Sequence, residues 1–176
     1  MSSLLVNKAE KIKLVIFDVD GTLTDGYLHY LSDGTEGKSF HVRDGLGLVL
    51  LMKAGIEVAT ITASKTPIIT QRMEALKVKH VYQGQFSKLA AYEDLLSKLN
   101  LAEEQIAYIG DDLPDLMIMR RVGLSVAVND AHDLVRECAH WVTSKNGGHG
   151  AVRELCDLIL NAQNKLDFAL QKFLET

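Results

Sequence analysis

The stretch Leu14-Val15-Ile16-Phe17-Asp18-Val19-Asp20-Gly21-Thr22 organises the rest of this chain. Its four consecutive apolar residues are typical of a strand that is covered on both faces of a sheet. Asp18 and Asp20 follow at alternate positions, so their side chains point the same way along an extended backbone. Two adjacent like charges are unfavourable unless a cation or a shared proton compensates them. The stretch therefore predicts a metal-assisted reaction on an anionic substrate.

Strands and helices are predicted to alternate along the whole chain. Apolar, β-branched runs predict strands at residues 12–18, 56–62, 79–82, 105–109, 124–128 and 141–142. Helical spacing predicts helices from Asp44 to just before Gly55, from about 66, and at 87–99, 113–122, 132–138 and beyond Gly150. This order favours an α/β fold, a doubly wound, mostly parallel, Rossmann-like sheet with helices on both faces. Ligands of such sheets bind at the carboxyl ends of the strands, where the polar residues of this chain fall.

Residues 27–42 have a different pattern, which predicts a β-hairpin inserted after the first strand. Aromatic and apolar residues at 27–30 precede the turn sequence Ser32-Asp33-Gly34-Thr35, and Ser39 to Val42 are expected to form the return strand. An isolated hairpin is only marginally stable in water. We therefore expect it to pack on the body of the domain or on a neighbouring subunit.

Length and composition indicate one ordered domain, residues 1–176, since domains commonly span about 100–200 residues. The formal net charge of −4 gives no electrostatic footprint for nucleic acid or for an anionic membrane surface. Residues 1–13 have no apolar core of signal-peptide length, and no apolar run is long enough to cross a bilayer. We expect a cytoplasmic protein, in which Cys138 and Cys156 serve packing.

Acidic residues dominate the candidate site. Hard oxygen ligands favour Mg²⁺, and no set of His and Cys residues with zinc spacing competes with Asp18, Asp20, Asp111, Asp112 and Asp115. Asp112 and Asp115 could equally cap a helix. Lys88 at the start of a helix is unfavourable for the helix dipole, which makes it a candidate phosphate ligand, although a solvated lysine is the simpler alternative. Thr62 could bind a phosphate oxygen or serve only the β-propensity of its strand.

These motifs together resemble the haloacid dehalogenase superfamily, over essentially the whole chain. Four motifs of that superfamily have their counterparts, in order, in Asp18-Val19-Asp20-Gly21-Thr22, Thr62, Lys88 and Gly110-Asp111-Asp112-Leu113-Pro114-Asp115. A short hairpin in place of a large cap domain is similar to the capless phosphatases, which form tetramers. Further similarity to the 3-deoxy-D-manno-octulosonate 8-phosphate phosphatases, enzymes of lipopolysaccharide synthesis, lies in residues 38–45, 109–112, 122–128 and 147–154.

The resemblance implies a role for each residue of the site. Asp18 would be the nucleophile that forms an aspartyl-phosphate, and Asp20 would protonate the leaving group and then activate water. Mg²⁺ would be bound by Asp18, Asp111 and the backbone carbonyl of Asp20. Thr62 and Lys88 would hold the phosphoryl oxygens. Asp112 and Asp115 would orient the metal-bound waters and Lys88.

The sugar acid phosphate substrate is implied by the same resemblance. Besides Asp20 and Lys88, the family pattern offers His41, Arg43, Asp44 and Arg72 as residues that bind it. One position departs from the pattern, because Ala63-Ser64 stand where the family usually has Gly-Arg. Serine cannot pair with a carboxylate as arginine does. A nine-carbon sugar acid 9-phosphate is therefore an alternative substrate.

Two further expectations concern assembly and a rival function. The family resemblance implies a homotetramer in which the hairpin lies near a neighbouring active site and the C-terminal tail, residues 146–176, closes over it. The glycines in Asn146-Gly147-Gly148-His149-Gly150 suit a mobile loop, with His149 as a minor catalytic candidate. A non-catalytic, receiver-like phosphorylation module is the rival. It is disfavoured because Asp18 ends the first strand and carries a second acid, Asp20, two residues on.

Overall fold

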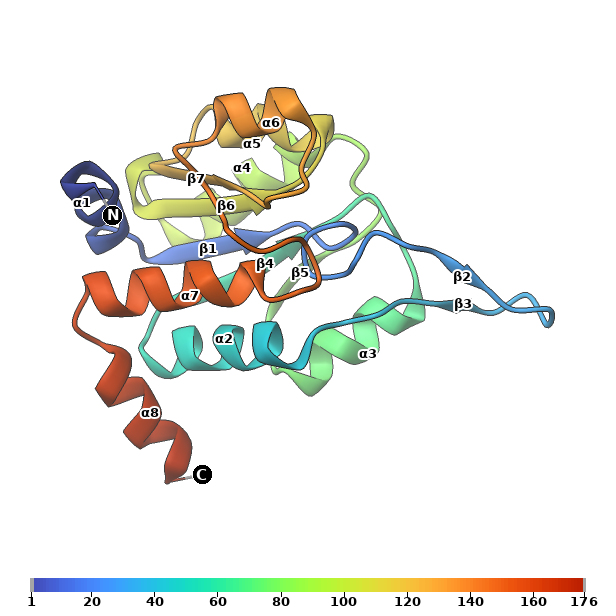
Figure 1. Ribbon diagram of the computed structural model, residues 1–176, viewed down its shortest axis with the longest axis horizontal. Helices are drawn as coiled ribbons and strands as arrows, with labels where there is room; N and C mark the ends of the chain where they lie inside the picture. Colours follow the sequence, from blue (N-terminus) through green and yellow to red (C-terminus); the bar gives the residue numbers. More distant parts are fainter. Residues whose placement is uncertain (1, 176) are drawn as a thin grey trace.

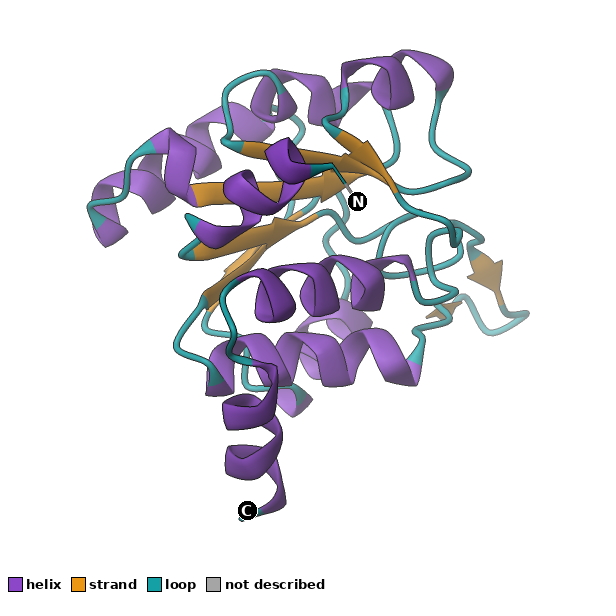
Figure 2. Cartoon of the chain, turned by 60° about the vertical axis from the view of Figure 1, so that its left-hand side comes forward, coloured by secondary structure: helices purple, strands orange, loops and turns teal. Residues whose placement is uncertain are grey.

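A six-stranded parallel sheet forms the centre of the computed structural model, which describes residues 2–175. The strand order is β5-β4-β1-β6-β7-β8. The strands are β1 (Leu14–Phe17), β4 (Glu57–Ile61), β5 (His80–Tyr82), β6 (Ile106–Gly110), β7 (Leu124–Ala127) and β8 (Trp141–Val142). Helices cover both faces of the sheet (Figures 1 and 2). The predicted α/β, doubly wound fold is confirmed.

Strand β1 lies in the interior of the sheet, between β4 and β6. All four of its side chains are fully buried, as the unbroken apolar run predicts. From β1 the chain builds the sheet outward through β4 and β5, and then crosses back to add β6, β7 and β8 on the other side of β1. The connections that leave β1 and β6 consequently diverge. This point of reversal is where open α/β sheets bind their ligands.

Two layers of helices enclose the sheet. Helices α2 (Val42–Lys53), α3 (Pro67–Ala75) and α7 (Ala151–Ala162) lie on one face, and α4 (Lys88–Leu99), α5 (Leu116–Met119) and α6 (Asp133–Cys138) lie on the other (Figure 1). Both cysteines are free, and Cys156 is buried in α7 as a packing residue. Cys138 is only partly buried.

The hairpin has a different register from the one expected. Its strands are β2 (His29–Tyr30) and β3 (Glu36–Gly37), and His29 pairs with Gly37. The return strand expected at Ser39–Val42 was wrong, because the N–H of Leu31 donates to the carbonyl of Thr35 and closes the turn early. Phe40 forms only an isolated bridge with Thr24. Val42 already belongs to α2.

Two other helical regions differ from the predictions, each for a local reason. Helix α1 (Ser3–Glu10) was missed, although the hydroxyl of Ser2 accepts a hydrogen bond from the N–H of Leu5 and so caps it. The helix expected at 113–122 is a 3₁₀ turn, Leu113–Asp115, followed by the short α5. A second 3₁₀ turn, Glu103–Gln105, precedes β6. Proline in the first turn and the Asp112 cap explain why helical structure starts at Leu113. They do not explain why it ends as early as Met119.

The C-terminal stretch consists of two helices, α7 and α8 (Leu166–Leu174). The chain turns between them at Asn164, which has a φ of 53°. Helix α8 packs on α2 and α7, away from the end of the sheet that carries the hairpin (Figure 1). The expected closure of the tail over an active site stays a prediction. No helix within residues 2–175 has the length and apolar character needed to span a membrane.

Candidate active site

A cavity of about 160 Å³ opens at the carboxyl edge of the sheet, where the strand order reverses. Asp18 follows β1, Thr62 follows β4, Asp111 follows β6, and Lys88 begins α4. The residues that the family resemblance implies for catalysis or metal binding all line this cavity, whereas the minor candidate His149 does not. The lining consists of Asp18, Asp20, Thr62, Ala63, Ser64, Lys88, Asp111, Asp112, Pro114 and Asp115.

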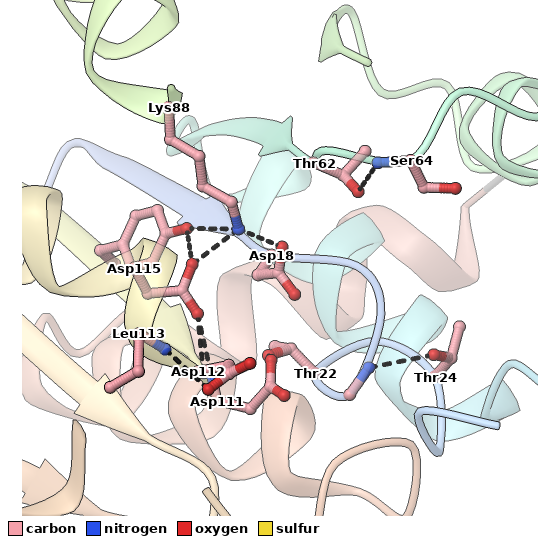
Figure 3. A network of polar contacts seen from close by, with 12 residues as sticks. Asp18, Thr22, Thr24, Thr62, Ser64, Lys88, Asp111, Asp112, Leu113 and Asp115 are labelled. Carbon is pink, nitrogen blue, oxygen red and sulfur yellow. Dashed lines mark hydrogen bonds and ion pairs between the residues drawn. The ribbon is translucent and has the colours of Figure 1, made fainter. Parts of the chain in front are cut away.

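Lys88 is the only cation among those lining residues, and it is buried with 4% of its surface exposed. Its Nζ donates to Oδ1 of Asp18 and, at 2.6 Å, to Oδ1 of Asp115 (Figure 3). Burial acts to lower the pKa of Lys88, but the charges of Asp18 and Asp115 outweigh it and raise that pKa. The simpler alternative, a solvated lysine on a helix face, is excluded.

Tyr108 belongs to the same network and was missed from the sequence. Its hydroxyl donates to Oδ1 of Asp115 at 2.6 Å and lies 3.3 Å from Nζ of Lys88. Tyr108 is fully buried in β6. A buried tyrosine hydroxyl usually has a hydrogen-bond partner, so a tyrosine inside a predicted interior strand next to an acidic motif was the available signal.

The carboxylate of Asp115 connects Lys88 and Tyr108 to the backbone of the loop after β6. Its Oδ2 accepts hydrogen bonds from the backbone N–H groups of Asp111, at 2.9 Å, and Asp112, at 3.2 Å. Oδ1 is taken by Lys88 and Tyr108. Asp112 is exposed, and its Oδ1 accepts from the N–H of Leu113, so it caps the 3₁₀ turn as the structural alternative proposed.

Carboxylate oxygens of Asp18, Asp111 and Asp115 lie within 4.8 Å of one another. Because the oxygens of Asp115 are engaged by protein donors, Asp18 and Asp111 are the pair left for a cation. Two hard oxygen ligands beside an open cavity fit Mg²⁺, which keeps several waters and takes few protein ligands. The donor chemistry of this site therefore fits the expected metal.

The pKa values of the acids reflect this crowding. Burial, and then the charge of Asp115, raises the pKa of Asp18 well above its usual value, against the opposing charge of Lys88. Burial and the charge of Asp115 also raise the pKa of Asp111 to about 7, against hydrogen bonds from Asp18 and Thr22. A divalent cation would stabilise both ionised forms.

The glycine-rich loop at 146–150 packs directly on the loop that follows β1. A Cβ on Gly147 would overlap the carbonyl oxygen of Gly21, and the N–H of Gly148 donates to the carbonyl of Thr22 at 3.0 Å. These contacts join the two loops in this structure, and the mobile closure expected from the glycines stays a prediction. His149 is exposed, outside the cavity lining, and its Nδ1 lies 2.7 Å from the carbonyl oxygen of Gly147.

The carboxylate of Asp44, a residue expected to bind substrate, accepts hydrogen bonds from the backbone of this chain. It is buried in α2, where its Oδ1 accepts from the N–H of Arg153 at 2.7 Å and its Oδ2 from that of Gly150 at 3.2 Å. The carboxylate thereby satisfies free N–H groups at the start of α7. These contacts join α2 to α7, and the role of Asp44 in binding substrate stays a prediction.

Three further candidates for substrate recognition, His41, Arg43 and Arg72, also lie outside the cavity lining. Arg43 is exposed, and Nδ1 of His41 lies 3.9 Å from the Asp44 carboxylate. The guanidinium of Arg72 stacks over the ring of Phe40 at 5.6 Å. Their roles in binding substrate remain predictions.

Asp20 is the one site carboxylate that contacts the hairpin. Its Oδ1 lies 2.6 Å from Nζ of Lys38, which comes directly after β3. Lys38 was not among the predicted site residues. The available signal was that it is the only lysine within residues 27–42.

Comparison with known proteins agrees with this geometry. A family model described as haloacid dehalogenase-like hydrolase matches residues 62–155. This chain belongs to the haloacid dehalogenase-like hydrolases. It is 51% identical to 3-deoxy-D-manno-octulosonate 8-phosphate phosphatase KdsC of Salmonella typhi, over 96% of this chain and 90% of that protein.

Solved structures of similar hydrolases superpose closely on the chain. A putative haloacid dehalogenase superfamily hydrolase from Legionella pneumophila has a TM-score of 0.98 and 54% identity, covering 98% of this chain and 95% of that one. The 3-deoxy-D-manno-octulosonate 8-phosphate phosphatase of Moraxella catarrhalis, in complex with magnesium, phosphate and its sugar acid, has a TM-score of 0.94 and 43% identity. That match covers 98% of this chain and 99% of the other.

Mg²⁺ binding is expected to release a proton near neutral pH. The pKa of Asp111 is raised to about 7 in the metal-free protein, so below that pH a proton must leave before the carboxylate can bind a cation. Affinity for Mg²⁺ should fall as the pH is lowered below about 7. Titration calorimetry in buffers of different ionisation enthalpy measures the released protons. Affinity that does not change across this pH range would contradict the expectation, and Asp111→Asn should remove binding and proton release together.

Proposed function

We propose that this chain is a Mg²⁺-dependent phosphatase that hydrolyses 3-deoxy-D-manno-octulosonate 8-phosphate in the cytoplasm, as a step of lipopolysaccharide precursor synthesis. One observation carries the proposal: a buried lysine joins the acid that follows β1 to an acid of the 3₁₀ turn after β6, beside a small cavity. The substrate is inferred from relatives about half identical over nearly the whole chain. Two free cysteines fit a reducing compartment.

The nucleophile in this proposal is Asp18. A carboxylate oxygen attacks phosphorus, the ester P–O bond breaks, and the leaving alkoxide takes a proton from Asp20. Water then attacks the aspartyl-phosphate while Asp20 accepts a proton from it. Inorganic phosphate leaves, and the Asp18 carboxylate is restored. Lys88 holds Oδ1 of Asp18 and so fixes the direction of attack.

The phosphoryl group is held by Thr62 and Lys88. The hydroxyl oxygen of Thr62 accepts from the N–H of Ser64 at 3.1 Å, which leaves the hydroxyl proton for a phosphoryl oxygen. Asp18, Asp111 and the backbone carbonyl of Asp20 would hold Mg²⁺, which would supply positive charge to the reacting carboxylate and phosphoryl groups. Asp112 would orient the metal-bound waters.

The sugar is too large for this cavity. Sites that enclose small organic ligands commonly measure about 300–1,000 Å³, and this one measures about 160 Å³. The phosphoryl group fits inside, and the sugar must extend beyond the rim. We infer that a neighbouring chain of a homotetramer completes the site with its hairpin, which exposes the apolar side chains of Tyr27, Leu28, Tyr30 and Leu31.

Ser64 supports a second substrate of the same class. It lines the cavity where an arginine was expected from the family pattern, so its wall offers no guanidinium for a carboxylate. A nine-carbon sugar acid 9-phosphate is the alternative. The receiver-like module is not supported, because the chain belongs to a hydrolase family.

Asp18→Asn and Asp20→Asn are expected to fail at different steps. Asp18→Asn removes the nucleophile and should lower turnover by at least about 10⁴-fold, with no phosphoenzyme formed. Asp20→Asn should lower it about 10²–10⁴-fold through slow leaving-group departure and slow hydrolysis. Acid-quenched mass spectrometry detects the phosphoenzyme. Asp94→Asn, at an exposed carboxylate of α4, is the control and should match the parent; a phosphoenzyme in Asp18→Asn would contradict the assignment.

Substrate choice can be measured directly. With Mg²⁺ present, kcat/KM for 3-deoxy-D-manno-octulosonate 8-phosphate should exceed that for nine-carbon sugar acid 9-phosphates by about tenfold or more, since a pocket built for one sugar loses contacts with the other. Phosphate release provides the readout. The reverse order of preference would favour the alternative substrate, and no release from either would refute both.

Assembly should depend on the hairpin. Sedimentation of the parent protein is expected to give four times the 19.4 kDa chain mass. The double change Tyr27→Ser and Tyr30→Ser should dissociate the tetramer and raise KM, because the sugar loses its contacts with the neighbouring hairpin. Leu4→Ser, at an exposed apolar residue of α1, is the matched control. A parent protein that sediments as a monomer would contradict the proposal.

A further inference from the structure

Lys38 connects the hairpin to the active site through a buried ammonium group. Its side chain is 1% exposed, and Nζ lies 2.6 Å from Oδ1 of Asp20 and 2.9 Å from Oε1 of Glu36. The Asp20 side chain is 31% exposed and lines the cavity. The carboxylates of Asp20 and Glu36 compensate the ammonium group for the hydration that it loses there.

The electrostatic balance at Lys38 keeps the ion pair intact. Burial acts to lower the pKa of Lys38, but hydrogen bonds and charge from Asp20 and Glu36 outweigh it and raise that pKa. An exposed lysine–carboxylate pair contributes little and holds no fixed geometry. Here the burial of Lys38 confines its contact with Asp20 to Oδ1. The contact leaves Oδ2 of Asp20 for a group in the cavity.

Lys38 itself is not placed to touch the substrate. It does not line the cavity, and its ammonium group is shared by two carboxylates. Its influence on the reaction must therefore pass through Asp20. A group that transfers a proton has to lie within about 3 Å of the oxygen it serves, and a displacement of about 1 Å can cost 10²-fold in rate.

We propose that Lys38 is a positioning residue for Asp20, and that it holds one carboxylate oxygen so that the other faces the leaving-group oxygen. This inference rests on the proposed acid/base role of Asp20. Asp20 is followed by Gly21, whose φ of 87° few other residues adopt, so the backbone turns away directly after it. The contact with Lys38 supplies a second fixed point. Because Lys38 follows β3 directly, the placement of the hairpin determines the placement of the acid.

The test compares two substrates that differ in their need for a proton. A sugar phosphate has a poor alkoxide leaving group that must be protonated, whereas 4-nitrophenyl phosphate releases a stable phenolate. Lys38→Met should lower kcat/KM for the sugar phosphate by about 100-fold and change that for 4-nitrophenyl phosphate by less than about threefold. Lys38→Arg, which keeps a charged donor, should restore most of the loss. A purely structural role would lower both values equally.

Controls separate this inference from the proposed function. Asp20→Asn should show the same selective loss; if it does not, the role of Asp20 fails. If Asp20→Asn is selective but Lys38→Met lowers both substrates equally, or neither, the inference about Lys38 is overturned. Lys8→Met removes a lysine that donates to the carbonyl of Gly123 at 2.8 Å, far from the site, and should leave both values unchanged.

A second variant covers the possibility that Lys38→Met fails to fold. Lys38→Gln keeps a hydrogen-bond donor and loses the charge, and its selective loss should lie between those of the methionine and arginine variants. Thermal unfolding of each variant reports its folded state. Equal rates for Lys38→Gln and the parent protein on the sugar phosphate would also overturn the proposal.

Discussion

The buried contact of Lys88 with Asp18 and Asp115 is the constraint on which the site depends. Carboxylates held this far from water and this near to one another repel, and an uncompensated buried charge costs several kcal/mol. Lys88 supplies the compensating charge from the start of α4. That position is unfavourable for the helix dipole, so the ion pairs must offset a local cost. Such an arrangement is stable only because both acids lie close by, Asp18 at the end of β1 and Asp115 in the 3₁₀ turn after β6.

The sheet places these groups without help from flexible segments. Asp18 and Asp111 follow neighbouring strands, β1 and β6, on either side of the point where the strand order reverses. Asp115 is fixed by two backbone N–H groups and by Tyr108, which is itself part of β6. The phosphoryl end of the site is therefore anchored to the core by hydrogen bonds. Rigid donors cost little reorganisation as charge develops during reaction.

Much of this end of the site could be predicted from the sequence. The apolar run at 14–17 identifies an interior strand, and the common edge of a parallel sheet brings Asp18, Thr62 and Asp111 together. The contacts of Tyr108 and Lys38 could not be predicted in the same way, because each depends on three-dimensional register. Lys38 reaches Asp20 because the hairpin turns early, so that its return strand ends at Gly37. The prediction placed the return strand too late, at 39–42. The burial of Asp44 likewise depends on how α2 packs against α7.

The residues of the site fall into two groups that differ in what holds them in place. The groups that hold the phosphoryl oxygens belong to the sheet and to α4, and their positions follow from core packing. The proton-transferring Asp20 has its second anchor on the hairpin, which is exposed and has little of its own to pack against. Docking of the hairpin on another chain would restrict that anchor as well as complete the sugar-binding wall. Assembly would then affect proton transfer and substrate binding through one segment, while the nucleophile and its lysine remain unchanged.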